Sequence, residues 1–167
     1  FIFYESKIML FTRMILSLFI IGFVLVASCS KDSSTNTPTT TSSIKAKVDG
    51  TSWDGSAAAV GSFKTNQLLV SGQGNGMYIT IVLYDISTTG TYQLGVLTNN
   101  HNVNIIEGSK SWLVSPQLGS GTVTVSTLTA TEVTGTFSFT APPSPNTPGI
   151  GTKTVTEGTF SIKLTQI

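Results

Sequence analysis

Charged residues are scarce in this chain of 167 residues, and arginine is almost absent. Only 10% of the residues are charged, against roughly 25% in an average soluble protein. From Cys29 onward seven lysines face seven acids, and no arginine remains. Proteins that bind nucleic acid need a basic surface with forked guanidinium donors. The composition therefore argues against nucleic acid as a partner.

The chain also has a single cysteine, Cys29, and a single histidine, His101. A disulfide needs a second cysteine, and a zinc site needs several cysteine or histidine ligands. His101 lies in the polar segment NNHNVN, which we predict to be a solvated loop. The glycine-rich segment GQGNG (72–76) lies between two predicted strands, so we predict a hairpin turn and not a phosphate-binding loop. We expect no metal and no cofactor.

The acids do not form a recognisable catalytic pair. Glu132 and Glu157 fall on the solvent side of their predicted strands, and Glu107, Asp49 and Asp54 adjoin or precede a glycine. Glycoside hydrolysis needs two carboxyl groups that converge across a cleft. A serine hydrolase needs a serine on a nucleophile elbow with a histidine as its base, and the sequence offers no such elbow for His101. We therefore predict that the protein is not an enzyme, and a hydrolase remains a remote alternative.

An apolar leader precedes the cysteine. Lys7 and Arg13 form a positive n-region, and the apolar stretch 14–26 has the length of a signal-peptide h-region, about 7 to 15 residues. Ala27 and Ser28 supply the small residues that precede a cleavage site. A permanent transmembrane helix, which needs about 20 apolar residues, is the alternative.

The residues around the cysteine, Val26-Ala27-Ser28-Cys29, resemble the lipobox of bacterial lipoproteins. That resemblance implies that Cys29 receives a diacylglycerol, that a peptidase cuts after Ser28, and that the new amine is acylated. Two or more acyl chains hold a protein on a membrane stably, whereas one holds it only marginally. Ser30 resembles the residue that directs lipoproteins to an outer membrane. We expect a lipid-anchored protein of the cell envelope.

The organisation that we predict has three parts: a signal peptide (1–28), a lipidated cysteine with a flexible Ser/Thr-rich tether (29–43), and a single β-domain (44–167). The tether contains no apolar residue after Cys29 and cannot build a core. The chain opens with Phe1, and Met9 and Met14 are both candidate starts, so residues 1–8 are candidates for untranslated sequence.

The β-domain shows apolar residues at every second position, with turn signals between the runs. The clearest predicted strands are 77–85, 121–130, 132–141 and 155–164. Six weaker strands are predicted at SIKAKV, AAAVGSF, NQLLVSG, GTYQLGV, VNIIEG and KSWLVS. About nine or ten strands predict an all-β fold, an antiparallel β-sandwich or a closed β-barrel.

Two local patterns carry further predictions. A Gly-Thr-aromatic pattern occurs at GTYQL, GTFSF and GTFSI, and we predict that its glycine provides the freedom of a turn at the entry to a strand. The proline-rich segment APPSPNTPG (141–149) is predicted to be exposed and unpaired.

Aromatic residues are the remaining candidates for a binding surface. Trp53 and Trp112 are candidates for sugar stacking, and core packing is the alternative for both. Tyr78 and Tyr84 share one face of their strand with Thr80, opposite the fully apolar face. This second face is the best candidate surface for a ligand or partner.

The chain as a whole resembles a family of small Bacteroidota lipoproteins of unknown function. The features that carry the resemblance are the lipobox, the tether, KVDGTSW, GTYQL, and the closing pair VTGTFSF and VTEGTFSI. This resemblance implies an all-β fold and a location in the cell envelope. The family has no established activity, so the resemblance assigns no catalytic residue to this chain. Two functions stay open: a non-catalytic binding module for glycan, peptide or another envelope protein, and a structural or assembly lipoprotein without a soluble ligand.

Overall fold

The structure is a computed structural model that describes residues 41–165. Contacts between Cα atoms divide the chain into Phe1–Pro38 and Thr39–Ile167, and the described residues belong to the second unit. The predicted signal peptide, Cys29 and nearly all of the tether lie outside the described residues.

The described residues form eleven β-strands and one turn of 3-10 helix, η1 (Ser56–Ala58), and they include no α-helix. The strands are β1 (Ser43–Val48), β2 (Thr51–Asp54), β3 (Val60–Lys64), β4 (Gln67–Gly74), β5 (Met77–Leu83), β6 (Gly90–Leu94), β7 (Asn102–Glu107), β8 (Lys110–Val114), β9 (Ser120–Leu128), β10 (Glu132–Ala141) and β11 (Lys153–Thr165). The predicted all-β fold is confirmed.

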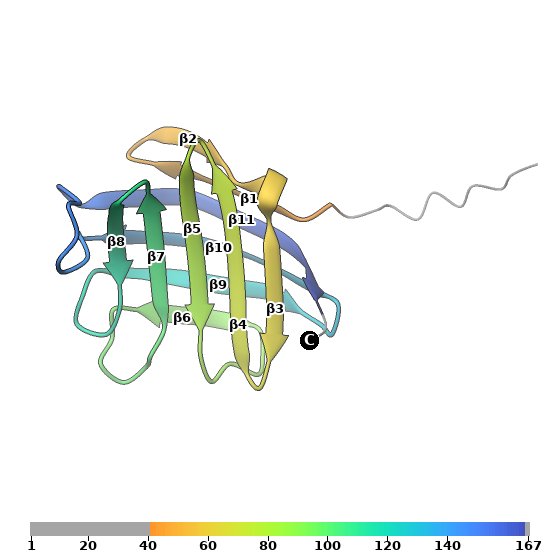
Figure 1. Ribbon diagram of the computed structural model, residues 1–167. Helices are drawn as coiled ribbons and strands as arrows, with labels where there is room; N and C mark the ends of the chain where they lie inside the picture. The colour runs from red at the N-terminus through yellow and green to blue at the C-terminus, as the bar shows by residue number, and fades with distance from the viewer. Residues whose placement is uncertain (1–40, 166–167) are drawn as a thin grey trace, which may run out of the picture. The chain divides into compact units, whose positions relative to one another are not determined.

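The strands lie in two layers, which Figure 1 shows one behind the other with their strands running crosswise. One layer has the order β6-β9-β10-β11, with β1 and β2 added beside β11, and the other has the order β3-β4-β5-β7-β8. The end of β11 pairs in parallel with β3, whereas every other strand pair is antiparallel. The long strand β11 therefore joins the two layers.

The proline-rich segment after β10 joins the layers a second time. The backbone N–H of Leu113 in β8 donates to the carbonyl of Pro142 at 3.0 Å, and the N–H of Ser144 donates to the carbonyl of Ser111 at 2.9 Å. The sheet thus closes nearly into a barrel. The prediction that 141–149 is unpaired is wrong, because the carbonyl of Pro142 and the N–H of Ser144 both pair with the edge of β8.

The predicted alternation agrees with the burial of the side chains. All ten predicted strands are present, and the residues predicted to point inward on the four clearest strands are buried. The strand β2 was not predicted, because it has only four residues with a single apolar one, Trp53. It forms through a tight turn in which Asp49 and Gly50 both have positive φ, 51° and 80°, the geometry that two-residue hairpins prefer.

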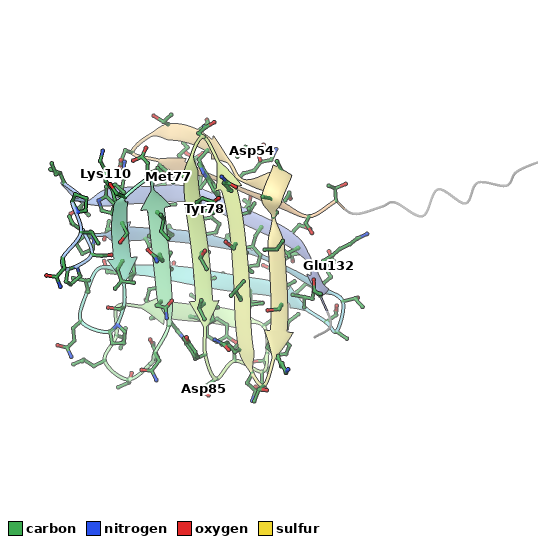
Figure 2. The ribbon with its side chains drawn as sticks, in the orientation of Figure 1. Asp54, Met77, Tyr78, Asp85, Lys110 and Glu132 are labelled. Carbon is green, nitrogen blue, oxygen red and sulfur yellow. The ribbon has the colours of Figure 1, made fainter. Side chains whose placement is uncertain are left out.

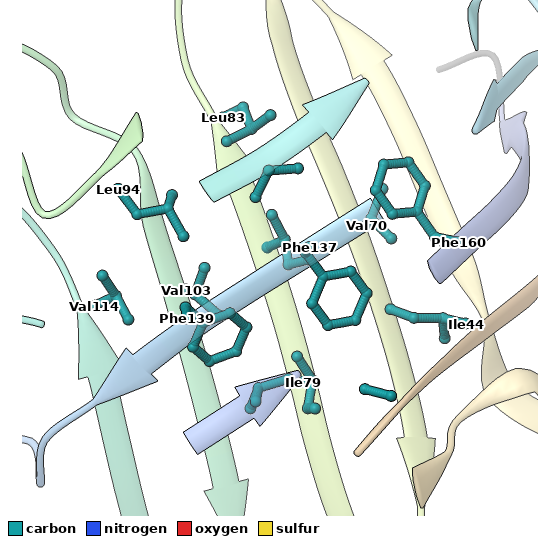
Figure 3. Packing of buried hydrophobic residues seen from close by; sticks show 14 of the residues in the cluster. Ile44, Val70, Ile79, Leu83, Leu94, Val103, Val114, Phe137, Phe139 and Phe160 are labelled. Carbon is teal, nitrogen blue, oxygen red and sulfur yellow. The ribbon is translucent and has the colours of Figure 1, made fainter. Parts of the chain in front are cut away.

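Phenylalanines pack between the layers and cover glycines (Figure 3). Three of them lie directly opposite a glycine on the neighbouring strand: Phe137 opposite Gly158, Phe160 opposite Gly135, and Phe139 opposite Gly121. The rings of Phe137 and Phe160 are stacked with their centroids 6.4 Å apart. The predicted role of glycine in the Gly-Thr-Phe pattern is wrong for Gly135 and Gly158, since both lie inside strands and leave room for a ring.

The outer side of the first layer is a nearly continuous array of hydroxyl groups. Cross-strand pairs place Thr91, Thr124, Thr136 and Thr159 in one row that ends at Lys45. The hydroxyls of Thr91 and Thr124 are hydrogen-bonded at 3.0 Å. We call this side the threonine face, and it explains how a domain with so few charges keeps a polar surface.

Candidate functional site

The outer side of the second layer carries the two tyrosines that the sequence singled out, and we call it the tyrosine face. On β4, β5, β7 and β8, cross-strand pairs arrange its residues in three rows: Gln73, Tyr78, Ile106 and Ser111; Ser71, Thr80, Asn104 and Leu113; and Leu69, Val82 and Asn102. The edge strand β3 adds Val60, Ser62 and Lys64 at the margin of the face. Tyr84 continues the same alternation one residue beyond β5 and is half-buried. The predicted face is therefore a real surface of the sheet.

Tyr78 and Ile106 are the most open large side chains of these rows. Their exposed fractions are 44% and 40%, and they lie directly opposite each other on β5 and β7. In the middle row, Ser71 Oγ and Thr80 Oγ1 are hydrogen-bonded at 2.8 Å. The face thus offers an aromatic ring, an aliphatic neighbour and a row of polar groups.

No residue of the three rows carries a charge at neutral pH. Figure 2 shows Tyr78 on β5, with Asp54, Asp85 and Lys110 toward the margins of the domain. The charges that surround the tyrosine face thus lie at strand ends and turns. The centre of the face can contact a ligand without desolvating an ion, which is a costly step.

The two tryptophans are part of the core and not of this surface. Trp53 is 3% exposed, and its Nε1–H donates to the carbonyl of Gly74 at 3.0 Å. Trp112 is 2% exposed, and its Nε1–H donates to the carbonyl of Gly151 at 2.9 Å. The core alternative therefore applies to both, and neither ring is open for sugar stacking. Trp112 is covered because the segment after β10 folds over β8.

His101 is buried, so the prediction of a solvated loop is wrong for this residue. It is 6% exposed, and its ring meets Tyr92 edge-on with 5.7 Å between centroids. Its Nδ1 accepts a hydrogen bond from the backbone N–H of Tyr84 at 3.2 Å. The alternation of inward and outward residues in the sequence could have predicted this burial. His101 lies two residues before Val103, on the same inward side as Val103 and Ile105. His101 therefore positions the backbone of Tyr84.

Burial lowers the pKa of His101 below its ordinary value of 6.5, against the opposing charge of Asp85. Because the folded pKa is lower, the unfolded chain binds more protons as the pH falls through 6.5. We expect the stability to be highest above pH 6.5 and to decrease as the pH falls from there through the folded pKa. Thermal unfolding at pH 7.5 and pH 5 should show this loss for the wild type.

The matched control is His101→Gln, which cannot titrate in this range. Its melting temperature should change less between the two pH values than that of the wild type. Equal losses in the two proteins would show that His101 is not the group responsible.

A shallow depression of about 400 Å³ lies beside the hairpin of β1 and β2. Its charged side chains form ion pairs with each other: Lys45 Nζ lies 3.1 Å from Asp54 Oδ2, and Lys47 Nζ lies 2.7 Å from Glu157 Oε1. Hydrogen bonds from Ser56, followed by the pairing with Lys45, lower the pKa of Asp54 to about 2. The depression therefore offers paired charges and not a free one.

A third ion pair lies at the other side of the same hairpin. Lys153 Nζ lies 3.0 Å from Asp49 Oδ2 and 5.0 Å from the centroid of the Trp112 ring. Burial opposes ionisation of Asp49, but the hydrogen bond from the Thr154 N–H and the contact with Lys153 together lower its pKa. These contacts fasten the hairpin and the start of β11 over Trp112.

Residues 41–165 contain one histidine, His101, and no cysteine. In that range no three His, Cys, Asp or Glu side chains lie close enough together to hold a metal ion. The same range contains no helix that is both long and apolar enough to cross a membrane.

The fold and the surface define the class of this protein: an all-β, nearly closed barrel-like domain with one sheet face that carries no charge at its centre. The chain belongs to the family described as a domain of unknown function (DUF6252), whose model matches residues 40–162. No curated protein and no solved structure matches the chain. The expected membership of a family without an established function is thus supported.

Proposed function

We propose that this protein is a lipid-anchored lipoprotein of the cell envelope and that its β-domain is a non-catalytic binding module. The ligand is a glycan, a peptide or another envelope protein, and it contacts the tyrosine face. The observation that carries this proposal is a broad sheet face without charge at its centre, with an exposed tyrosine at one end and Tyr84 at the other.

The lipid anchor is supported by the sequence around Cys29. The apolar stretch 14–26 leads into Val-Ala-Ser-Cys, and a tether without apolar residues follows. A random coil of fourteen residues spans on the order of 20 Å on average, so an anchored domain would stay close to the lipid surface. Ser30 favours sorting to an outer membrane, on its periplasmic side or at the cell surface.

Lipidation is tested by replacing the cysteine. Labelled palmitate should enter the wild-type protein and should not enter Cys29→Ser, since the thiol is the site of diacylglycerol attachment. The variant should also leave the membrane fraction. Equal labelling of both proteins would contradict the lipoprotein assignment.

The binding surface is tested by photocrosslinking in cells that express the full chain. A photoreactive aromatic residue at position 78 should form adducts, because Tyr78 is exposed on the proposed contact surface. The matched control carries the same residue at position 136, which is exposed on the threonine face. Adducts from neither position, or equal adducts from both, would contradict a binding role for the tyrosine face and favour a structural lipoprotein.

A further inference from the structure

We infer that the ligand of the tyrosine face is a neutral polysaccharide that lies along β5 from Tyr78 to Tyr84. This inference rests on the proposed binding function and narrows its ligand to one chemical class. Three properties of the face point to it: the lack of charge at its centre, its mixture of polar and apolar side chains, and the position of its tyrosines.

The first property is electrostatic complementarity. An acidic polysaccharide, a phosphorylated ligand or a charged peptide needs opposite charges at the surface that binds it. The three rows contain none, although Lys110 and Glu107 lie close by at the β7–β8 turn. A ligand without charge matches this surface, because neither partner then has to desolvate an ion.

The second property is the order of the rows. The middle row places hydroxyl and amide groups from Ser71, Thr80 and Asn104 between the aliphatic side chains of Val60 and Leu113, and the row beside it joins Leu69 and Val82 to Asn102. A sugar ring is amphipathic in the same way, with hydroxyls at its edge and C–H groups on its faces. A protein partner would instead favour a contiguous apolar centre, which the polar row interrupts.

One atom of the polar row lacks a partner. Oδ1 of Asn104 is buried and has no hydrogen-bond partner among the described residues. A buried acceptor without a partner costs free energy. A half-turn of the amide exchanges Oδ1 and Nδ2, so the side chain can present either an acceptor or a donor. Because Oδ1 itself is buried, only the remaining part of this half-buried side chain is open to a ligand.

The third property is the spacing of the aromatic rings. Tyr84 lies six residues after Tyr78 and one residue beyond the end of β5, a separation of roughly 20 Å for an extended chain. Two rings at this separation can each carry one sugar unit of an extended chain. The hydrogen bond to His101 fixes the backbone of Tyr84, the second of the two tyrosines. An oligosaccharide of several units therefore fits better than a single sugar.

The test uses the unit of residues 39–167, which contains every residue of the hydrophobic core. Affinity gel electrophoresis is run with neutral polysaccharides (laminarin, xyloglucan, galactomannan, mannan and dextran) and with acidic ones (alginate and heparin). We expect retardation by at least one neutral polysaccharide and by neither acidic one. Tyr78→Ala should weaken that binding about tenfold or more, whereas Thr136→Ala on the threonine face should leave it unchanged.

The melting temperatures of both variants are measured alongside, so that a loss of binding is not mistaken for a loss of folding. Binding by no neutral polysaccharide, or binding that Tyr78→Ala leaves intact, would overturn the inference. The proposed function would survive that result if position 78 alone still forms photocrosslinks in cells, and it would fall with the inference if it does not.

Discussion

Truncation of Phe137 or Phe160 to alanine is expected to lower the free energy of unfolding by about 3–5 kcal/mol. Both rings are 3% exposed, and they stack on each other between the two layers. Each also covers a glycine, so the residue directly opposite on the neighbouring strand has no side chain that could fill the cavity. The expected loss is a large part of the roughly 5–15 kcal/mol that stabilises a domain, and urea unfolding would measure it.

The matched controls lie one residue away on the opposite side of the same strands. Thr136 is exposed and Ser161 is half-buried, so Thr136→Ala and Ser161→Ala should each cost well under about 1 kcal/mol. Similar losses for the phenylalanine variants and these controls would show that the two strands do not alternate as described.

Adding a single methyl group at Gly135 or Gly158 is expected to destabilise the domain by about 3 kcal/mol, at the upper end of what over-packing costs. A Cβ at Gly135 would lie 2.1 Å from the carbonyl oxygen of Thr124 and 2.5 Å from the Phe160 ring. A backbone atom cannot rotate away as a side chain can, so the strands themselves must separate. The melting temperatures of Gly135→Ala and Gly158→Ala would show the effect.

A double-mutant cycle tests whether the Phe137 ring causes the loss of stability in Gly158→Ala. Two of the three atoms nearest to a Cβ at this position belong to the Phe137 ring. Gly158→Ala should therefore cost less in a Phe137→Ala background than in the wild type. If the two costs are equal, the ring is not what excludes a side chain at Gly158.

The sequence predicted those parts of the fold that depend on alternation. Phe137, Phe139 and Ile162 point inward because a strand with one face on the core must alternate. The tyrosine face followed from the same rule, since Tyr78 and Thr80 must share the side opposite Ile79. Local periodicity was therefore sufficient for the strands and for the candidate surface.

Features that depend on contacts between distant segments were not predictable in this way. Trp112 alternates as an inward residue, but its cover comes from the segment that follows β10 and from Lys153. The glycines of the Gly-Thr-Phe pattern have a role only because two copies of the pattern pair antiparallel with each other. In both cases the sequence around the residue does not show which distant segment will pair with it, or in which register.

The pairing of β1 with β11 also constrains when the domain can form during synthesis. Ser43 lies opposite Ser161, so the first strand cannot find its neighbour until the last one has left the ribosome. Contacts so distant in sequence slow folding, because a long loop must close before they form. A nascent chain that ends before β11 exposes apolar strands and remains open to chaperones. For the export that we propose, this delay would keep the chain unfolded until its synthesis is complete.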